Sequence, residues 1–327
     1  MQKMNLVFDL DKLEAGDILL TGGKGKISTA ITVSTFSRFS HAALFVDSTG
    51  FIEANLDGVT VNNPQRELFE PNDVVTLLRL KNTASPEVIT QICYYAYSRV
   101  GTEYSKIEAS KTLVKGLGRH EANRQFCSRL VAEAYAHAGL NLVANPAFCS
   151  PKDLASSPLL SQIDGFLRPA KPAEIKFALS SSPLEEQAEI ISCFLEDVRS
   201  VCNQDIQSMG QVIYLLIENS DLDEKVTNLL KASGYLEIYQ MDEDNNPWRY
   251  GLCSYAEAGF FGESAKERAK KDYQLAVKLI TKFEGELEVV KTLKAQYHRK
   301  YFDTLDELYT NLVEWQNTAL RVAKENA

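Results

Sequence analysis

Apolar and polar positions follow a strand-like pattern in residues 16–80 of the chain. Short apolar runs such as "GDILL", "GVTVNN" and "DVVTLLRL" are bounded by Gly, Asn, Asp and Pro, which indicates strands joined by turns. "SHAALFVD" and "GFIEANL" flank the turn residues "STG", and this arrangement predicts a β-hairpin. We therefore expect a small antiparallel sheet in this region.

Two helices are predicted after these strands, at 86–100 and 127–138. Ser85 is the expected N-cap of the first, with Pro86 in the first helical position. In the second, apolar residues recur every three or four positions after Cys127, and Gly139 marks its end. The segment between the helices contains several Gly residues and charges, so we interpret it as an active-site or lid loop.

The composition of the chain changes at "RPAKPAEIKFALSSSP", which has three prolines and a serine run. We place a domain boundary there, which gives domains over residues 1–172 and 173–327. The fold class predicted is α+β: a first domain with a small antiparallel sheet packed on helices, followed by an all-α domain. Helices of the second domain are expected at 185–202, 205–219, 222–232, 263–300 and 303–323.

The last two predicted helices carry matching apolar stripes, so they should form a long antiparallel hairpin. On the longer helix the stripe consists of Tyr273, Val277, Ile280, Leu287, Val290, Leu293 and Tyr297. Such stripes fit either an internal core or a dimer seam, and the bundle pattern favours the core. Residues 234–262 interrupt the helices with aromatic residues, Gly and Pro. We interpret them as a hairpin that docks the helical part onto the first domain, or alternatively as a ligand-contacting loop.

Composition limits the function classes. The chain has 327 residues, 45% of them hydrophobic and 24% charged, as expected for a globular protein with a substantial core. A net charge of −9 argues against a nucleic-acid partner. Acidic residues interrupt the N-terminal apolar positions, so no secretory signal is expected, and no run reaches the roughly 18 apolar residues of a transmembrane segment. We predict a cytoplasmic location, with non-classical export left open.

The cysteines favour reduced thiols over a disulfide framework. All six are scattered, without CxxC pairs or metal-ligand spacing. We therefore predict no zinc, no other metal and no cofactor.

Cys127 is the candidate nucleophile. It begins a predicted helix, where unpaired backbone N–H groups and the positive end of the helix dipole stabilise a thiolate. The alternative is that Cys127 is a small apolar core residue, which is the commoner role of a buried cysteine. A base near the sulfur is needed to favour the first interpretation.

His41 is the preferred base among four histidines. His298 lies on the long helix, and His137 lies about three turns along the Cys127 helix. His120, in the charged loop, is a second choice. His41 opens a strand and shares a face with Ala43 and Phe45, and we expect a helix to cover that face.

Glu53 is the candidate third member of the site. It lies on the neighbouring strand of the hairpin, on a face from which it can pair with His41. A carboxylate among apolar strand residues is costly to bury without a partner. Each residue also has a structural explanation, since His41 could be a satisfied edge histidine and Glu53 could face water.

The ordered motifs "GDILL", "FSHAALFV", "FIEAN", "GTEYS", "FCSRLVAEAY" and "SPKDLASSP" resemble the circularly permuted papain-like hydrolases of the YiiX/YebB type. That group is related to the NlpC peptidases and to lecithin retinol acyltransferase, and its histidine precedes its cysteine. The resemblance covers about residues 14–168 and does not extend to the helical part. It implies a permuted papain-like fold for the first domain.

The resemblance also implies roles for individual residues. Cys127 would be the nucleophile, His41 the base and Glu53 the acid that orients the base. Tyr104 of "GTEYS" matches a motif of the group and would lie on the substrate or oxyanion side of the site, and Asp17 of "GDILL" matches a recurrent position near it, or serves only to form a turn. The aspartate that often follows the tyrosine in the group is Ser105 here.

These residues predict a cysteine-dependent hydrolase or acyltransferase that cleaves an amide or ester bond through a thioester. The expected substrate is a peptide, an amide or an acyl lipid, and fold alone does not choose among them. One alternative is an inactive binding module of the same fold whose helical domain engages a protein partner; another is a redox sensor at Cys127. The C-terminal helices could also mediate a dimer.

Overall fold

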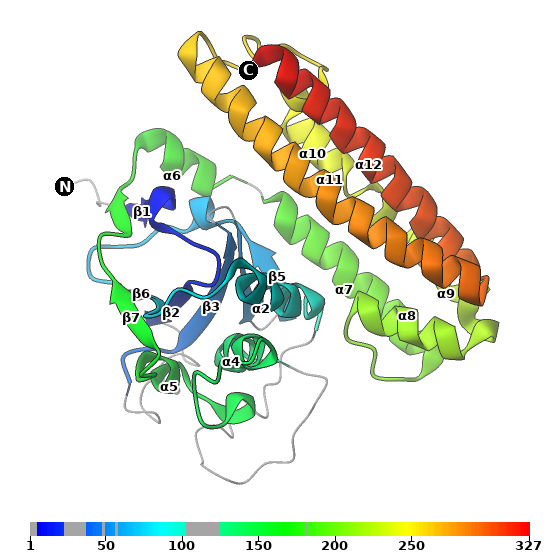
Figure 1. The fold of residues 1–327 in the computed structure, drawn as a ribbon, viewed down its shortest axis with the longest axis horizontal. Coiled ribbons are helices and arrows are strands. Elements are labelled where there is room, and N and C mark those ends of the chain that lie inside the picture. Colours follow the sequence, from blue (N-terminus) through cyan, green and yellow to red (C-terminus); the bar gives the residue numbers. More distant parts are fainter. Residues whose placement is uncertain (1–4, 23–36, 48–49, 56–57, 103–124, 181) are drawn as a thin grey trace. The chain divides into compact units, whose positions relative to one another are not determined.

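The computed structural model describes residues 5–22, 37–47, 50–55, 58–102, 125–180 and 182–327 (Figure 1). The chain divides into two compact units, one of Met1–Ala188 with Asp205–Gln211 and one of Glu189–Gln204 with Val212–Ala327. Strands belong to the first unit and the second is helical, so the predicted α+β class is confirmed. The first unit continues past residue 172, through the short helix α6 (Pro172–Ala178).

A six-stranded antiparallel sheet organises the first unit, with the strand order β5-β4-β3-β2-β6-β7. The predicted hairpin is present as the neighbouring strands β3 and β4, in which Ala43 lies opposite Glu53. A separate two-stranded sheet joins β1 to β8. The strands are β1 (Leu6–Phe8), β2 (Ile18–Gly22), β3 (His41–Asp47), β4 (Gly50–Asn55), β5 (Gly58–Asn62), β6 (Val74–Leu80), β7 (Leu160–Ile163) and β8 (Leu167–Pro169).

Helices α2 (Pro86–Ser98) and α4 (Cys127–His137) cover one face of the six-stranded sheet. Aliphatic side chains of the strands, such as Leu44 and Ile52, pack there against Leu130 of α4, and all three are fully buried. Burying a side chain of this size contributes about 1.5–3 kcal/mol. This packing fixes α4, and therefore its first residue, against the central strands.

Helix α4 begins and ends where the sequence predicts. Phe126 is extended (φ −139°, ψ 162°), so the helix starts at Cys127. At the other end Gly139 has φ +82°, a conformation that favours glycine, and its N–H donates to the carbonyl of Ala136. Ser85 and Pro86 likewise begin α2 as predicted, with the Ser85 hydroxyl accepting from the Val88 N–H.

The opposite face of the sheet is covered differently from our prediction. His41, Ala43 and Phe45 share a face, but that face packs against an aromatic cluster and not against a helix. The ring of Phe8 from β1 meets Phe45 edge-on, with ring centroids 5.4 Å apart. Adjacent strand residues point to opposite faces, and the helices pack on the aliphatic Ala42, Leu44 and Val46 side. On the aromatic side, β1 and its neighbouring segments pack against the sheet. Members of this cluster are Phe8, Leu13, Leu19, Ala43, Phe45, Phe51, Phe69, Leu77 and Phe166.

Short helical segments complete the first unit. They are η1 (Leu10–Lys12), η2 (Pro64–Arg66), η3 (Pro146–Phe148) and α5 (Pro151–Ala155), in addition to α6. Helix η2 directly follows β5, and the Asn63 side chain caps it by accepting from the Gln65 N–H at 2.9 Å.

The helices of the second half were predicted to within a few residues, except α10, which was not predicted. They are α7 (Pro183–Cys202), α8 (Met209–Glu218), α9 (Asp223–Ala232), α10 (Gln240–Asn245), α11 (Glu263–Tyr297) and α12 (Lys300–Asn326), with the short turns η4 (Ser220–Leu222), η5 (Tyr235–Glu237) and η6 (Pro247–Tyr250). Helices α11 and α12 form the predicted antiparallel hairpin (Figure 1), which reverses at His298 with φ +50°. Their mutual packing supports the core interpretation of the stripes.

Two expectations for the second half were wrong in detail. Near the start of α11, Tyr273 and Val277 are exposed, and Asp272 and Ala276 are buried in their place; farther along the helix Val290 is buried as predicted. At this end the buried face is shifted by one residue, and Asp272 accepts a hydrogen bond there from Trp248 at 3.1 Å. Residues 234–262 form α10 and 3-10 turns and no hairpin. Within the second unit, Tyr250 of this segment stacks on Trp315 of α12, with ring centroids 4.1 Å apart.

Candidate active site

His41 and Glu53 are brought together by the register of the β3–β4 hairpin. Glu53 lies opposite Ala43, so His41 is its diagonal neighbour, two positions away on β3. Diagonal pairs are within reach of long side chains. The Nε2 atom of His41 lies 2.5 Å from Oε2 of Glu53, and the two side chains are 28% and 18% exposed. The predicted contact between these residues is therefore present.

Asn62 holds the other oxygen of Glu53. Its Nδ2 donates to Glu53 Oε1 at 2.9 Å and to the Thr60 hydroxyl at 3.2 Å. Thr60 lies opposite Glu53 in the β4–β5 pairing, and Asn62 follows two positions later on the same face. Both carboxylate oxygens are thus fixed. Sequence reasoning missed Asn62, although pairing "GVTVNN" with "FIEAN" in register would have found it.

Cys127 reaches the same place from the other layer of the unit. As the first residue of α4 it is 4% exposed, and its sulfur hydrogen-bonds to the His41 ring. The backbone N–H groups of Ala42 and Ser128 also donate to the sulfur. Burial alone raises the pKa of this thiol, but these hydrogen bonds and the charge of His41 outweigh burial and lower the pKa below its ordinary value.

The pKa of His41 moves in the complementary direction. Burial lowers the pKa of the ring, yet hydrogen bonds and charge interactions with Cys127 and Glu53 raise it well above its ordinary value. A lowered cysteine pKa beside a raised histidine pKa favours a thiolate and an imidazolium over two neutral groups. His41, the link between the sulfur and the carboxylate, is therefore positioned to stabilise a charged pair.

Glu67 is a second carboxylate near this group, and no sequence pattern pointed to it. It follows η2 in an irregular segment, where no periodicity indicates which way a side chain faces. Burial raises its pKa to about 7, helped by repulsion from Glu53 and opposed by attraction to His41.

The structure does not bring Asp17 to the site. Asp17 lies just before β2, where its carbonyl accepts a hydrogen bond from the Phe45 N–H. His41 lies at the other end of the β2–β3 pair, opposite Thr21. Its buried carboxylate accepts two hydrogen bonds from Arg79, both at 2.7 Å. It also accepts from the Glu14 N–H at 2.8 Å. This arrangement agrees with the turn-forming alternative and corrects the expectation of a place beside the substrate.

Other candidates lie elsewhere. Tyr104 falls outside the described residues, as do Ser105 and His120. His137 lies at the far end of α4, where its ring packs against Tyr95 with centroids 5.1 Å apart. His298 forms the turn between α11 and α12.

Two further features bear on the kind of site. Among the described residues, no group of three or more His, Cys, Asp or Glu side chains is arranged to hold a metal ion. A search of the same residues finds no helix long and apolar enough to span a membrane.

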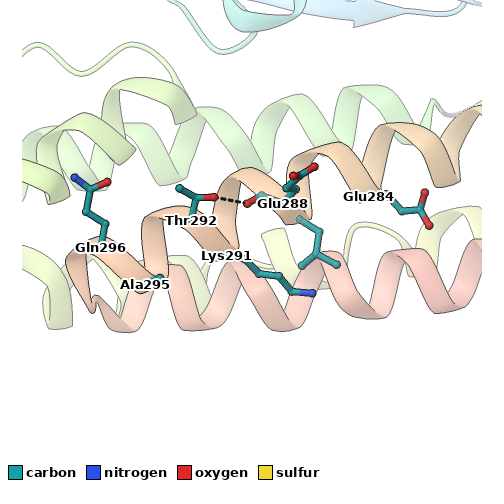
Figure 2. A pocket seen from close by; sticks show the side chains of 7 residues that line it. Glu284, Glu288, Lys291, Thr292, Ala295 and Gln296 are labelled. Atoms are coloured by element: carbon teal, nitrogen blue, oxygen red, sulfur yellow. Dashed lines mark hydrogen bonds between the residues drawn. The ribbon is translucent and has the colours of Figure 1, made fainter.

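A hollow of about 720 Å³ lies on one face of α11, and its lining has neither a cysteine nor a histidine (Figure 2). It is open and lined by Glu284, Leu287, Glu288, Lys291, Thr292, Ala295 and Gln296. The Thr292 hydroxyl donates to the Glu288 carbonyl of the same helix at 3.0 Å, as the dashed line shows. Neither a thiol nor an imidazole is among the lining residues, so the hollow is not a second candidate for the chemistry.

Comparison with known proteins gives one family and a distant structure. Residues 12–150 match the family described as permuted papain-like amidase enzyme, YaeF/YiiX, C92 family. This confirms the predicted resemblance for the N-terminal part of the chain, and the matched segment includes Cys127, His41 and Glu53. The crystal structure of metalloprotein yiiX from Escherichia coli O157:H7 is 16% identical and covers 46% of this chain and 97% of its own, with a TM-score of 0.31. The curated proteins gave no match.

Proposed function

We propose that this chain, whose residues 12–150 belong to the permuted papain-like amidase family, is a cysteine hydrolase of amide or ester bonds. Cys127 is the nucleophile, His41 is the general base and acid, and Glu53 orients His41. The observation that supports this most strongly is the position of His41, which hydrogen-bonds to Cys127 on one side and to Glu53 on the other. This is the arrangement that a thiol needs for nucleophilic catalysis.

The first half of the proposed reaction forms a thioester. The Cys127 thiolate attacks the carbonyl carbon of the substrate, and the carbonyl π electrons move to oxygen to give a tetrahedral oxyanion. The backbone N–H of Cys127 belongs to the first turn of α4, where such groups have no helical partner, and it is the donor we assign to the oxyanion. Collapse of the intermediate breaks the bond to the leaving group, which takes a proton from the His41 imidazolium.

The second half releases the acyl group. Neutral His41 accepts a proton from water as the water oxygen attacks the thioester carbonyl. The sulfur then leaves as thiolate, and the products are a carboxylic acid and the original imidazolium–thiolate pair. Because Glu53 accepts at Nε2, Nδ1 is the ring nitrogen available for these transfers. An amine or alcohol acceptor in place of water would make the same site an acyltransferase.

The alternatives from the sequence receive less support. An inactive binding module predicts either that Cys127 and His41 lie out of hydrogen-bonding reach or that the cleft is plugged. The first condition is not met, because the two side chains are hydrogen-bonded. A redox sensor needs a resolving thiol. Cys149 contacts the α4 start, with its Sγ 3.2 Å from the Ser128 carbonyl, but it is buried and burial raises its pKa, which disfavours a reactive thiolate.

The substrate class and the helical half form part of the same proposal. Peptides, other amides and acyl lipids all present a carbonyl that this chemistry accepts. We propose that residues 173–327 select the substrate, control access or engage a protein partner or a second copy, while residues 1–172 carry the catalytic groups.

Selective alkylation tests the proposal directly. The intact protein is treated with iodoacetamide at pH 6, and each cysteine peptide is quantified by mass spectrometry over time. Solvent exposure alone predicts that the exposed Cys193 reacts fastest, whereas a thiolate at Cys127 predicts that this buried residue does. Cys127→Ala should lose the fast adduct and keep the fold. A wild-type chain in which Cys127 reacts no faster than Cys193 would refute the proposal.

A further inference from the structure

The segment that follows η2 orients Glu67 toward the face of the sheet that carries His41 and Glu53. The residue is extended (φ −80°, ψ 124°), and two positions later Phe69 forms an isolated β-bridge with Leu6. Phe69 is buried in the aromatic cluster that covers the His41 face of the sheet. In an extended chain, residues two apart point the same way. The Glu67 side chain therefore faces the side of the sheet from which His41 and Glu53 project.

The Glu67 carboxylate has no hydrogen bond or ion pair within the part of the chain that the structure describes. The neighbouring Arg66 binds other groups: its guanidinium donates to the carbonyl of Ser180 at 2.5 Å and lies over the Phe177 ring. Helix α6 packs against η2, and Glu174 on α6 pairs with Arg168 at 2.6 Å. The charged residues on these elements are Arg66, Lys171, Glu174 and Lys176. The charges that act on Glu67 are instead those of Glu53, which repels it, and His41, which attracts it.

This cluster has two acids and one imidazole. Glu53 has both oxygens satisfied, by His41 and by Asn62, so it is fixed in place. Glu67 has no such partners among the described residues, and the charges of Glu53 and His41 act on it. Attraction between two groups is mutual, so an ionised Glu67 stabilises the His41 imidazolium as much as the imidazolium stabilises it.

We infer that Glu67 is a positioning residue that adds to the support which Glu53 gives the His41–Cys127 pair: ionised, it favours the imidazolium, and protonated, it withdraws that contribution. The inference rests on the proposed function, because it assigns Glu67 to the reactive group of that mechanism. It adds a dependence on pH that the Cys127, His41 and Glu53 trio does not have by itself.

The direction of this dependence follows from the sign of the charge. The raised pKa of Glu67, about 7, means that the side chain is neutral in mild acid and anionic above neutrality. An anion beside His41 favours the protonated ring. As the pH rises through neutrality, the protein therefore gains support for the imidazolium and keeps the ion pair to a higher pH than it would without Glu67.

An NMR titration of His41 in the full chain tests the inference. The Cε1–H signals of the ¹³C-labelled histidines are followed from pH 4 to 10, and His41 is assigned by its absence in His41→Gln. In the wild type we expect the His41 shift to show an extra inflection near neutrality. Glu67→Gln should remove that inflection and raise the acid dissociation constant of the imidazolium about three- to tenfold. Glu70→Gln, which removes a charge three residues along the same segment, is the matched control and should change neither.

The outcomes separate this inference from the proposed function. If wild-type His41 titrates at its ordinary value and Cys127 is not selectively alkylated, the proposed function fails. If Cys127 is reactive but the His41 titration is the same in Glu67→Gln as in the wild type, only the Glu67 inference is overturned. Circular dichroism checks that Glu67→Gln is folded. If Glu67→Gln does not fold, Glu67→Asp is measured in its place, and the inflection in the His41 titration is expected to shift. In that case, a wild-type titration curve without an inflection would contradict the inference.

Discussion

Two acids lie near opposite ends of the β2–β3 pair and have different partners; Asp17 is buried, and Glu53 of the neighbouring strand β4 is 18% exposed. At one end Asp17 receives two hydrogen bonds from the Arg79 guanidinium, whose charge does not change near neutral pH. At the other end Glu53 pairs with the imidazole of His41 and helps to raise the pKa of that ring well above its ordinary value. The first acid can only hold the fold together. The second belongs to a group whose charge changes, which is the property that acid–base chemistry requires.

Glu67 extends this comparison to an acid with no partner of its own. Within the described residues its carboxylate makes no ion pair, and repulsion from Glu53 adds to the cost of its burial. The three acids therefore differ in what acts on them. A guanidinium binds Asp17, an imidazole and an amide bind Glu53, and the charges of Glu53 and His41 act on Glu67. The partner of each acid decides whether its removal should affect stability, reactivity or both.

The largest expected effect is on stability, from Asp17→Ala. Removing this buried carboxylate leaves Arg79 without its main partner, and breaking such a pair costs about 3–5 kcal/mol of unfolding free energy. Urea unfolding of the intact chain measures the loss, while Cys127 alkylation should remain at the wild-type rate. Glu14→Ala is the control, because Glu14 is the exposed partner of Arg79 and should cost less than about 1 kcal/mol. If Asp17→Ala is folded but its Cys127 is no longer reactive, Asp17 would have to belong to the active site after all.

Glu67→Gln should instead stabilise the protein, and only at higher pH. The pKa of Glu67 is raised from 4.5 to about 7, so the unfolded chain releases this proton before the folded one does. The penalty is absent at pH 4 and complete by pH 8, where it is on the order of 3 kcal/mol. Urea unfolding of the variant and the wild type at both pH values measures the difference. An equal effect at pH 4 and pH 8 would show that the charge of Glu67 is not its cause.

Glu53→Gln should reduce reactivity more than stability. A neutral amide keeps the shape of the side chain but removes the charge that supports the His41 imidazolium. We expect Cys127 alkylation at pH 6.5 to slow about tenfold, which corresponds to one pKa unit. Asp47→Asn removes an acid from the opposite end of β3 and should leave the rate unchanged. Equal rates in Glu53→Gln and the wild type would remove Glu53 from the group.

Asn62→Ala is expected to have the smallest effect. It deletes one hydrogen bond to Glu53, worth about 1 kcal/mol, so Cys127 alkylation should slow about fivefold. Asn63→Ala is the neighbouring control, because Asn63 caps η2 and touches neither Glu53 nor His41. It should lower stability slightly and leave the alkylation rate alone. If both variants slow the reaction equally, the effect is a general loosening of the segment.

The local parts of this account could be predicted from the sequence. Helix α4 follows from its apolar spacing, with Phe126 extended before it and Gly139 after it, and these features are encoded within a few residues. The hairpin itself could be predicted, but the His41–Glu53 contact also depends on the irregularity between Phe45 and Asp47, which places Glu53 opposite Ala43. Tyr104 stays a prediction, since it falls outside the described residues.

The features that could not be predicted depend on contacts between residues that are distant in sequence or on irregular segments. Asp17 and Arg79 are 62 positions apart, so no local pattern reveals that the Arg79 guanidinium hydrogen-bonds to the Asp17 carboxylate. The shifted face near the start of α11 includes Asp272, which sequence periodicity assigns to solvent but which accepts hydrogen bonds from Trp248 and Tyr255. Glu67 lies in an irregular segment, where side-chain direction is set by the packing of Phe69 and not by a repeat.

The most direct test of the central claim is the ionisation of the Cys127 sulfur. Thiolate absorbance at 240 nm is recorded for the wild type from pH 3 to 10, and the signal of Cys127→Ala is subtracted at each pH. A sulfur paired with the His41 imidazolium should give a midpoint well below the ordinary value of about 8.5. A midpoint at or above that value would mean that Cys127 is an ordinary buried thiol and that the three residues do not act as a catalytic group.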